Sequence, residues 1–133
     1  MLDRVDFVDC RLSGLQLIGA RLRNVRFVRC QLDACSARSL AGYRVEFDDC
    51  RIAGADFTRA GLPGAQFIDC DLTGADFSNA DVAGARFHGS RLDGVRGVAS
   101  LRGATVDLAQ VVTLAVAMAT ALGITVDADA ASD

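Results

Sequence analysis

A large apolar residue recurs at every fifth position of this chain, and that period constrains the fold more than any other feature. From Leu2 to Leu92, all but two of the nineteen positions in this register carry Leu, Ile, Val or Phe, the exceptions being Ala37 and Gly42. A small apolar residue, usually Ala, Cys or Val, stands two positions before most of these centres. Neither the helical nor the strand period places both sets on one side of an element. The chain therefore has to turn a corner about every five residues.

The residues at the expected corners agree with this interpretation. Two positions after each centre, Gly, Asn or Asp occupies thirteen of nineteen sites, and these residues tolerate the positive φ that tight turns require. A longer period of twenty residues lies above the first, because Val-x-Phe-x-x-Cys-x-Leu begins at Val5 and again at Val25, with close variants at Val45, Ala65 and Ala85. Four pentapeptides thus make one coil, whose equivalent residues stack on the next coil at a spacing of ~4.8 Å.

Several segments resemble the A-(D/N)-(L/F)-x-x signature of the pentapeptide-repeat family: Ala55-Asp56-Phe57, Cys70-Asp71-Leu72, Ala75-Asp76-Phe77 and Ala80-Asp81-Val82. The resemblance covers residues 1 to about 95. It implies an all-β fold, a right-handed quadrilateral β-helix of about five coils and roughly 24 Å in length, closed by a capping α-helix. Because Ala37 and Gly42 leave two adjacent centres small, we expect residues 37–43 to bulge outward as a loop.

A C-terminal helix is expected over residues 108–122. Asp107 is its predicted N-cap, Gln110 the capping-box partner, and Gly123 the residue that ends it. One apolar stripe should cover the last coil, and its members are Leu108, Val111, Val112, Ala115, Ala119 and Leu122. We therefore divide the chain into a β-helix over residues 1–98, a helical module over 99–124 and a flexible tail over 125–133.

The other side of the predicted helix is nearly as apolar as the first. Its residues are the candidate dimer interface, Leu114, Val116, Ala117 and Met118. An apolar patch of this kind is larger than soluble monomers usually expose, and a two-fold partner with the same patch would bury it. Similar pentapeptide-repeat proteins that confer quinolone resistance dimerise through a C-terminal helix, so the resemblance implies a homodimer. The alternative is a simple cap that lies in a groove.

Several side chains invite a chemical interpretation. Cys10, Cys30, Cys50 and Cys70 lie twenty residues apart and stack inward, which favours core packing, with Ser90 as the polar end, over a metal ladder. We expect His88 to be solvent-exposed. The stacked pairs Asp56 with Asp76 and Asp49 with Asp69 should bond local turn amides rather than hold a cation. No catalytic, cofactor-binding or metal-binding residue is predicted, and the chain is not expected to be an enzyme.

The composition limits the classes of partner that we expect. The net charge is −3, with 14 basic and 17 acidic residues, so direct binding of nucleic acid is not expected. The sequence offers no signal peptide and no membrane span, and the expected location is the cytoplasm. Because Met1 leads directly into the repeat, the open first coil is either a docking edge or part of a longer repeat protein.

Two functions remain after these exclusions. The first is a scaffold or protein–protein interaction module with an unknown protein partner. The alternative, suggested by the resemblance, is a DNA mimic that acts on DNA gyrase or another type II topoisomerase. Its candidate acidic partner surface contains Glu46, Asp48, Asp49, Asp69 and Asp71. Residues 1–40 carry seven Arg against four Asp, which reverses the sign of the surface and weakens this alternative.

Overall fold

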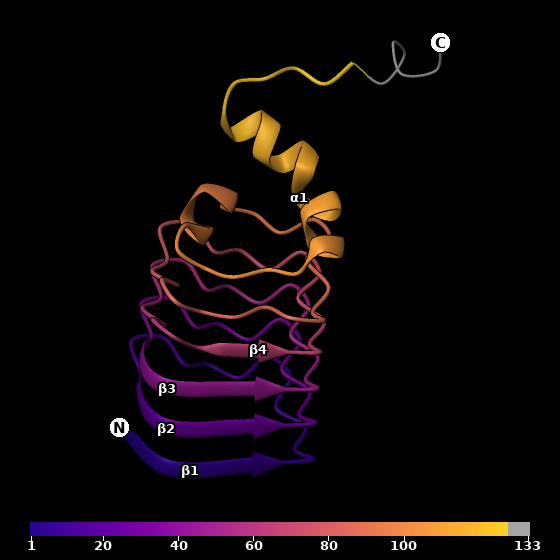
Figure 1. Cartoon of the computed structure of the whole chain (residues 1–133). Coiled ribbons are helices and arrows are strands. Elements are labelled where there is room, and N and C mark those ends of the chain that lie inside the picture. The colour runs from indigo at the N-terminus through magenta and orange to yellow at the C-terminus, as the bar shows by residue number, and fades with distance from the viewer. Residues whose placement is uncertain (128–133) are drawn as a thin grey trace.

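The computed structural model describes residues 1–127, which form a β-solenoid with one C-terminal helix (Figure 1). Its strands are β1 (Leu2–Val8), β2 (Arg21–Val28), β3 (Ala41–Asp48) and β4 (Gln66–Ile68). They pair in the order β1-β2-β3-β4, all parallel. A 3-10 helix, η1 (Val98–Leu101), and the α-helix α1 (Leu108–Ala121) follow.

The twenty-residue period sets the register of the sheet. Val5 pairs with Val25 and Val25 with Val45, and Phe47 pairs with Phe67. Outside the named strands, isolated parallel bridges keep the same spacing, as between Arg11 and Gln31. The last bridge joins Arg86 to Thr105, one residue short of that register. The repeat therefore remains in step almost to the start of α1, where Figure 1 places the helix at the end of the stack opposite the N-terminus.

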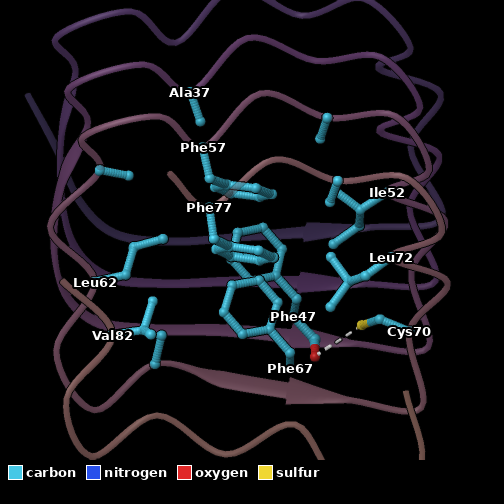
Figure 2. Packing of buried hydrophobic residues seen from close by; sticks show 14 of the residues in the cluster. Ala37, Phe47, Ile52, Phe57, Leu62, Phe67, Cys70, Leu72, Phe77 and Val82 are labelled. Carbon is cyan, nitrogen blue, oxygen red and sulfur yellow. Dashed lines mark hydrogen bonds between the residues drawn. The ribbon is translucent and has the colours of Figure 1, made fainter. Parts of the chain in front are cut away.

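The core consists of stacked columns of identical or similar side chains (Figure 2). Phe7, Phe27, Phe47, Phe67 and Phe87 form one column, with ring centroids 4.9–5.0 Å apart and rings nearly parallel. Phe57 and Phe77 form a second column at 5.0 Å. The two columns meet edge to face, as between Phe67 and Phe77 at 6.0 Å and 90°. Both arrangements are favourable for aromatic pairs, and together they fill the interior of the solenoid.

Residues 37–43 do not bulge outward, so that prediction was wrong. The Ala37 amide donates to the Asp56 carbonyl at 2.7 Å, and the Gly42 amide donates to the Gly61 carbonyl at 2.8 Å, as in the other coils. The reason is the packing of large side chains around Gly42. A Cβ at Gly42 would lie 2.7 Å from Leu62 Cδ2 and 2.8 Å from Val45 Cγ2, and Leu40 Cδ2 would be 3.5 Å away. These side chains already occupy the space that the small residue leaves, which keeps this coil in register.

The predicted helix and its cap are confirmed to within one residue. Asp107 is the N-cap of α1, and it forms a reciprocal capping box with Gln110. Leu122 is the C-cap, and Gly123 follows with a φ of 76°, a conformation that glycine adopts without strain. None of the helices among residues 1–127 is long and apolar enough to span a membrane. Most of the expected flexible tail, residues 128–133, lies outside the described residues.

Candidate interaction surfaces

The five residues of the candidate acidic surface come from two parts of the coil. Glu46 and Asp48 lie on β3, and Asp49 occupies the corner that follows it. Asp69 occupies the equivalent corner after β4. Asp71 belongs to a neighbouring ladder, where it bridges Arg51 on one side and Arg91 on the other. The candidate surface thus runs around a corner and includes arginines on its second side.

An arginine from a neighbouring coil neutralises one of these five residues, Glu46, and three further ion pairs lie elsewhere on the coils. Arg26 on β2 donates from Nε to Glu46 Oε2 at 2.7 Å, and Arg29 pairs with Asp9 at the same distance. Two further pairs join Arg38 to Asp56 and Arg51 to Asp33. The side chains of these pairs are largely open to solvent, so the pairs add little to stability. Their main effect is an alternation of sign along the solenoid, which does not resemble the uniform charge of a DNA backbone.

The carboxylates of Asp56 and Asp76 accept hydrogen bonds from residues of the adjacent turns, as the sequence predicted. The Asp56 carboxylate accepts the Thr58 amide at 2.9 Å, and that of Asp76 accepts both the amide and the hydroxyl of Ser78. Hydrogen bonds from Ser78 hold the pKa of Asp76 below its ordinary value. Asp49 and Asp69 instead occupy positive-φ corners. Across residues 1–127, no group of three or more His, Cys, Asp or Glu side chains is arranged to hold a metal ion.

The inward cysteines form a hydrogen-bonded ladder with the phenylalanine column. The Sγ atoms of Cys30, Cys50 and Cys70 lie 3.2–3.3 Å from the carbonyls of the phenylalanines twenty-three residues earlier, and Figure 2 shows this bond for Cys70. All five thiols are free. A hydrogen bond with Cys50 raises the pKa of the Cys70 thiol, and burial raises it further. Burial also raises the pKa of Cys35 to about 11. Packing, rather than chemistry, therefore accounts for these cysteines.

Two further residues, Ser90 and Gln110, continue the ladder beyond Cys70. Gln110 was not identified as a member from the sequence. The Ser90 hydroxyl donates to the Phe67 carbonyl at 2.7 Å. Gln110, twenty residues further on, donates from Nε2 to the Phe87 carbonyl and to the Ser90 carbonyl at 2.8 Å. The twenty-residue spacing was the signal that could have identified Gln110. A residue of the first turn of α1 thus completes the hydrogen bonding of the solenoid.

Asp107 provides a second anchor for the helix. Besides capping α1, its carboxylate accepts the Gly89 amide at 2.9 Å, and this bond and the Gln110 amide lower the pKa of Asp107. His88, expected to be exposed, is partly buried beside this junction. Its Nδ1 atom is buried and has no hydrogen-bond partner. The first turn of α1 is therefore fixed to the last coil by polar contacts.

The orientation of α1 reverses the one that we expected. Leu114 is 4% exposed, whereas Leu108 and Val112, expected to cover the last coil, are 83% and 75% exposed. Met118 packs against the core, while Val116 is 59% exposed. The reason is Gln110: its buried amide fixes the rotation of the helix, and Leu114 and Met118 follow it on the same face. Of the four candidate interface residues, only Val116 clearly faces outward, and Ala117 is partly buried.

Comparisons with known proteins agree with this architecture. The family model of pentapeptide repeats matches residues 2–36 and 62–96 in eight copies. Among solved structures, the pentapeptide-repeat protein Rfr23 from the cyanobacterium Cyanothece 51142 has a TM-score of 0.69 and 19% identity, covering 80% of this chain and 84% of its own. A search of curated proteins gave no match.

Two other solved structures match over more of this chain with lower TM-scores. A pentapeptide-repeat protein from the thylakoid lumen of Arabidopsis thaliana has a TM-score of 0.43 and 23% identity, with coverage of 83% and 74% of the two chains. QnrB1, a plasmid-mediated fluoroquinolone resistance protein, has a TM-score of 0.40 and 22% identity, with coverage of 92% and 80%. At these identities the likeness concerns the fold alone.

Proposed function

This chain belongs to the pentapeptide-repeat family, and we propose that it is a non-enzymatic scaffold, a protein–protein interaction module of the cytoplasm. Members of the family are generally structural or interaction modules. The observation that carries the proposal is the packing of the interior. Phe57, Phe67, Phe77 and Phe87 are at most 1% exposed, so any binding has to use the outer faces or the helical end. The five free thiols favour a reducing compartment.

We also propose the finer geometry of the coil: right-handed, four-sided and about five turns long. Four ladders of parallel bridges support the four sides, and they begin at Asp6↔Arg26, Arg11↔Gln31, Gln16↔Ser36 and Arg21↔Ala41. In this proposal, residues 1–98 are the β-helix and residues 99–124 the helical module.

A paired charge reversal tests the interaction module. Immobilised protein should retain a partner from the host lysate, and the same partner, once purified, should bind directly. The double variant Arg26→Glu with Glu46→Arg keeps the ion pair but exchanges the positions of its two charges. It should weaken the binding of a partner that contacts this face of β2 and β3. Exchanging Arg29→Asp with Asp9→Arg, an exposed ion pair at the corners that follow β1 and β2, is the matched control. Retention equal to that of heat-denatured protein would contradict the proposal.

The alternative is a DNA mimic that modulates DNA gyrase. Residues 41–80, with seven acidic residues against three Arg, favour it, but Arg26 neutralises Glu46 and the surface changes sign at β2, which carries three Arg and no acidic residue. We therefore expect the purified protein to leave gyrase supercoiling unaffected at low micromolar concentration. Clear inhibition at an equimolar ratio of protein to enzyme would instead establish the mimic and identify gyrase as the partner.

We further propose a homodimer through α1, with a different interface from the one first expected. The outward stripe contains Leu108, Val112 and Val116, which are 59–83% exposed, and no charged residue lies within α1. Such a continuous apolar stripe is unusual on a monomer, and a two-fold related copy would bury it against its own equivalent.

A further inference from the structure

An apolar groove separates the second half of α1 from η1 and the segment that follows it. Its volume is about 520 Å3, and its walls include Val98, Leu101, Val106, Leu114 and Met118. Cavities of this size, about 300–1,000 Å3, are typical of sites for small molecules. A shallower hollow of about 390 Å3 lies between Val95, Gly97 and the other side of the helix, at Ala117 and Thr120.

The groove forms where the polar contacts of α1 end, because those contacts are confined to its first turn. Asp107 and Gln110 hold the first turn on the last coil, and Leu114 packs one turn later. Beyond it the helix rises away from the coil, as Figure 1 shows. Leu101 and Leu114 are buried and Met118 packs against the core. The open part of the groove therefore lies toward Ala121 and Leu122, which are exposed.

The mouth of the groove carries one cation. Arg102 is the only charged residue among those that line it, and its side chain is exposed. No ion pair joins Arg102 to any residue in the described part of the chain. An apolar channel with a single unpaired cation at its rim is complementary to an amphipathic anion, whose tail leaves water while its head remains at the surface.

We propose that this groove binds a medium-chain carboxylate, with the hydrocarbon along Met118, Ala121 and Leu122 and the carboxylate at Arg102. A second copy of α1 fits the site less well, because the helix has no acidic residue to pair with Arg102. The site also lies on the opposite side of α1 from Leu108 and Val112, so it does not depend on the proposed dimer.

Calorimetric titration with decanoate tests the proposal, with decanol as the neutral comparator. Wild-type protein should bind decanoate saturably, and Ala121→Trp, which fills the groove, should abolish binding. The matched control is Ala115→Trp, an exposed position of the same helix that does not line the groove; it should bind like the wild type. Arg102→Gln should weaken decanoate about two- to fivefold, the effect of an exposed ion pair, and leave decanol unchanged.

Three results would overturn the inference. One is an absence of saturable decanoate binding to the wild type up to about 1 mM, the limit of weak specific affinity. Another is an equal loss of binding in Ala115→Trp and Ala121→Trp, which would place the ligand elsewhere. The third is an Arg102→Gln variant that binds decanoate as tightly as the wild type. If Ala121→Trp converts a dimer into a monomer and decanoate never binds, a second copy occupies the groove.

Discussion

Each corner of the solenoid places one residue at positive φ, even where the sequence does not favour it. Thirteen of these residues are Gly, Asn or Asp, and the remaining six, which were not predicted to turn in this way, are Arg4, Arg29, Ala34, Ser39, Arg44 and Arg59. A left-handed backbone costs an ordinary L-residue about 1–2 kcal/mol. The stacking of the coils therefore overrides local preference at these six sites.

Ala34→Gly should stabilise the protein. Ala34 has a φ of 57° and an exposed side chain, so the change removes backbone strain and loses little packing. After the greater chain entropy of glycine is subtracted, the gain should be about 0.5 kcal/mol. Urea unfolding measures it. Ala83→Gly, an exposed site without positive φ, is the control and should lose stability, and a loss at Ala34 as well would contradict the explanation.

Leu62 and Gly42 should behave as one unit in the core. A Cβ on Gly42 would lie 2.7 Å from Leu62 Cδ2 and 2.8 Å from Val45 Cγ2, with Leu40 Cδ2 at 3.5 Å. Leu62 is fully buried, so Leu62→Ala should cost about 2–5 kcal/mol through the cavity it leaves, and Gly42→Leu should cost about 1–3 kcal/mol through overpacking.

The double variant tests this compensation. Because the side chain introduced by Gly42→Leu would enter the space vacated by Leu62, Leu62→Ala with Gly42→Leu should cost clearly less than the sum of the two single changes. Stabilities from urea unfolding of all four proteins give the coupling. Strict additivity would mean that Leu62 does not fill the space beside Gly42.

At the scale of elements, the helix joins the solenoid through a hydrogen bond that the repeat itself supplies. Cys70, Ser90 and Gln110 lie twenty residues apart, and each donates to the phenylalanine carbonyl twenty-three residues before it. The third member has left the coil and belongs to α1. The side chain of Gln110 thus sets both the position and the rotation of the helix.

Gln110→Leu should release the helix while leaving the coils folded. The change removes the donor to the Phe87 and Ser90 carbonyls and the acceptor for the Asp107 amide, and buried groups left unpaired cost about 1–3 kcal/mol each. Hydrogen exchange should become faster in residues 107–122 and stay slow in β2 and β3. Gln31→Leu, an exposed glutamine of the solenoid, is the control. Unchanged protection of α1 would show that its apolar contacts are sufficient.

The sequence predicted the features that repeat every five or twenty residues. It did not predict how the core packs around the small residue Gly42 or how α1 is rotated. Corners, core columns and the helix cap depend on residues within a few positions of one another, so they can be identified from local patterns. The space beside Gly42 is filled mainly by Leu62, which belongs to the next coil, and by Val45, so this packing could not be identified from the local pattern at residues 37–43. The rotation of α1 could not be predicted from apolarity, because both of its faces are apolar and a buried amide decides between them.

At the scale of the whole molecule, surface charge and surface apolarity are segregated. The alternating ion pairs lie along the coils, as between Arg26 and Glu46, whereas α1 carries no charge. Exposed apolar side chains gather at and after the helix, where Leu108, Val112 and Leu122 are each at least 75% exposed. The C-terminal end is therefore the part of the molecule best suited to self-association, and the coils remain available to other partners.

The wild-type chain should form a dimer with twice its mass of 14.0 kDa, measured by light scattering at tens of micromolar. Val112→Glu with Val116→Glu should give a folded monomer, because it places charge on the outward stripe and leaves the inward face intact. Leu114→Glu with Met118→Glu should instead detach α1, because Leu114 is buried and Met118 packs against the core. Circular dichroism distinguishes the two, since only the second pair should lose helix signal. A wild type that remains monomeric would leave α1 as a cap for the last coil and remove the dimer from the proposed function.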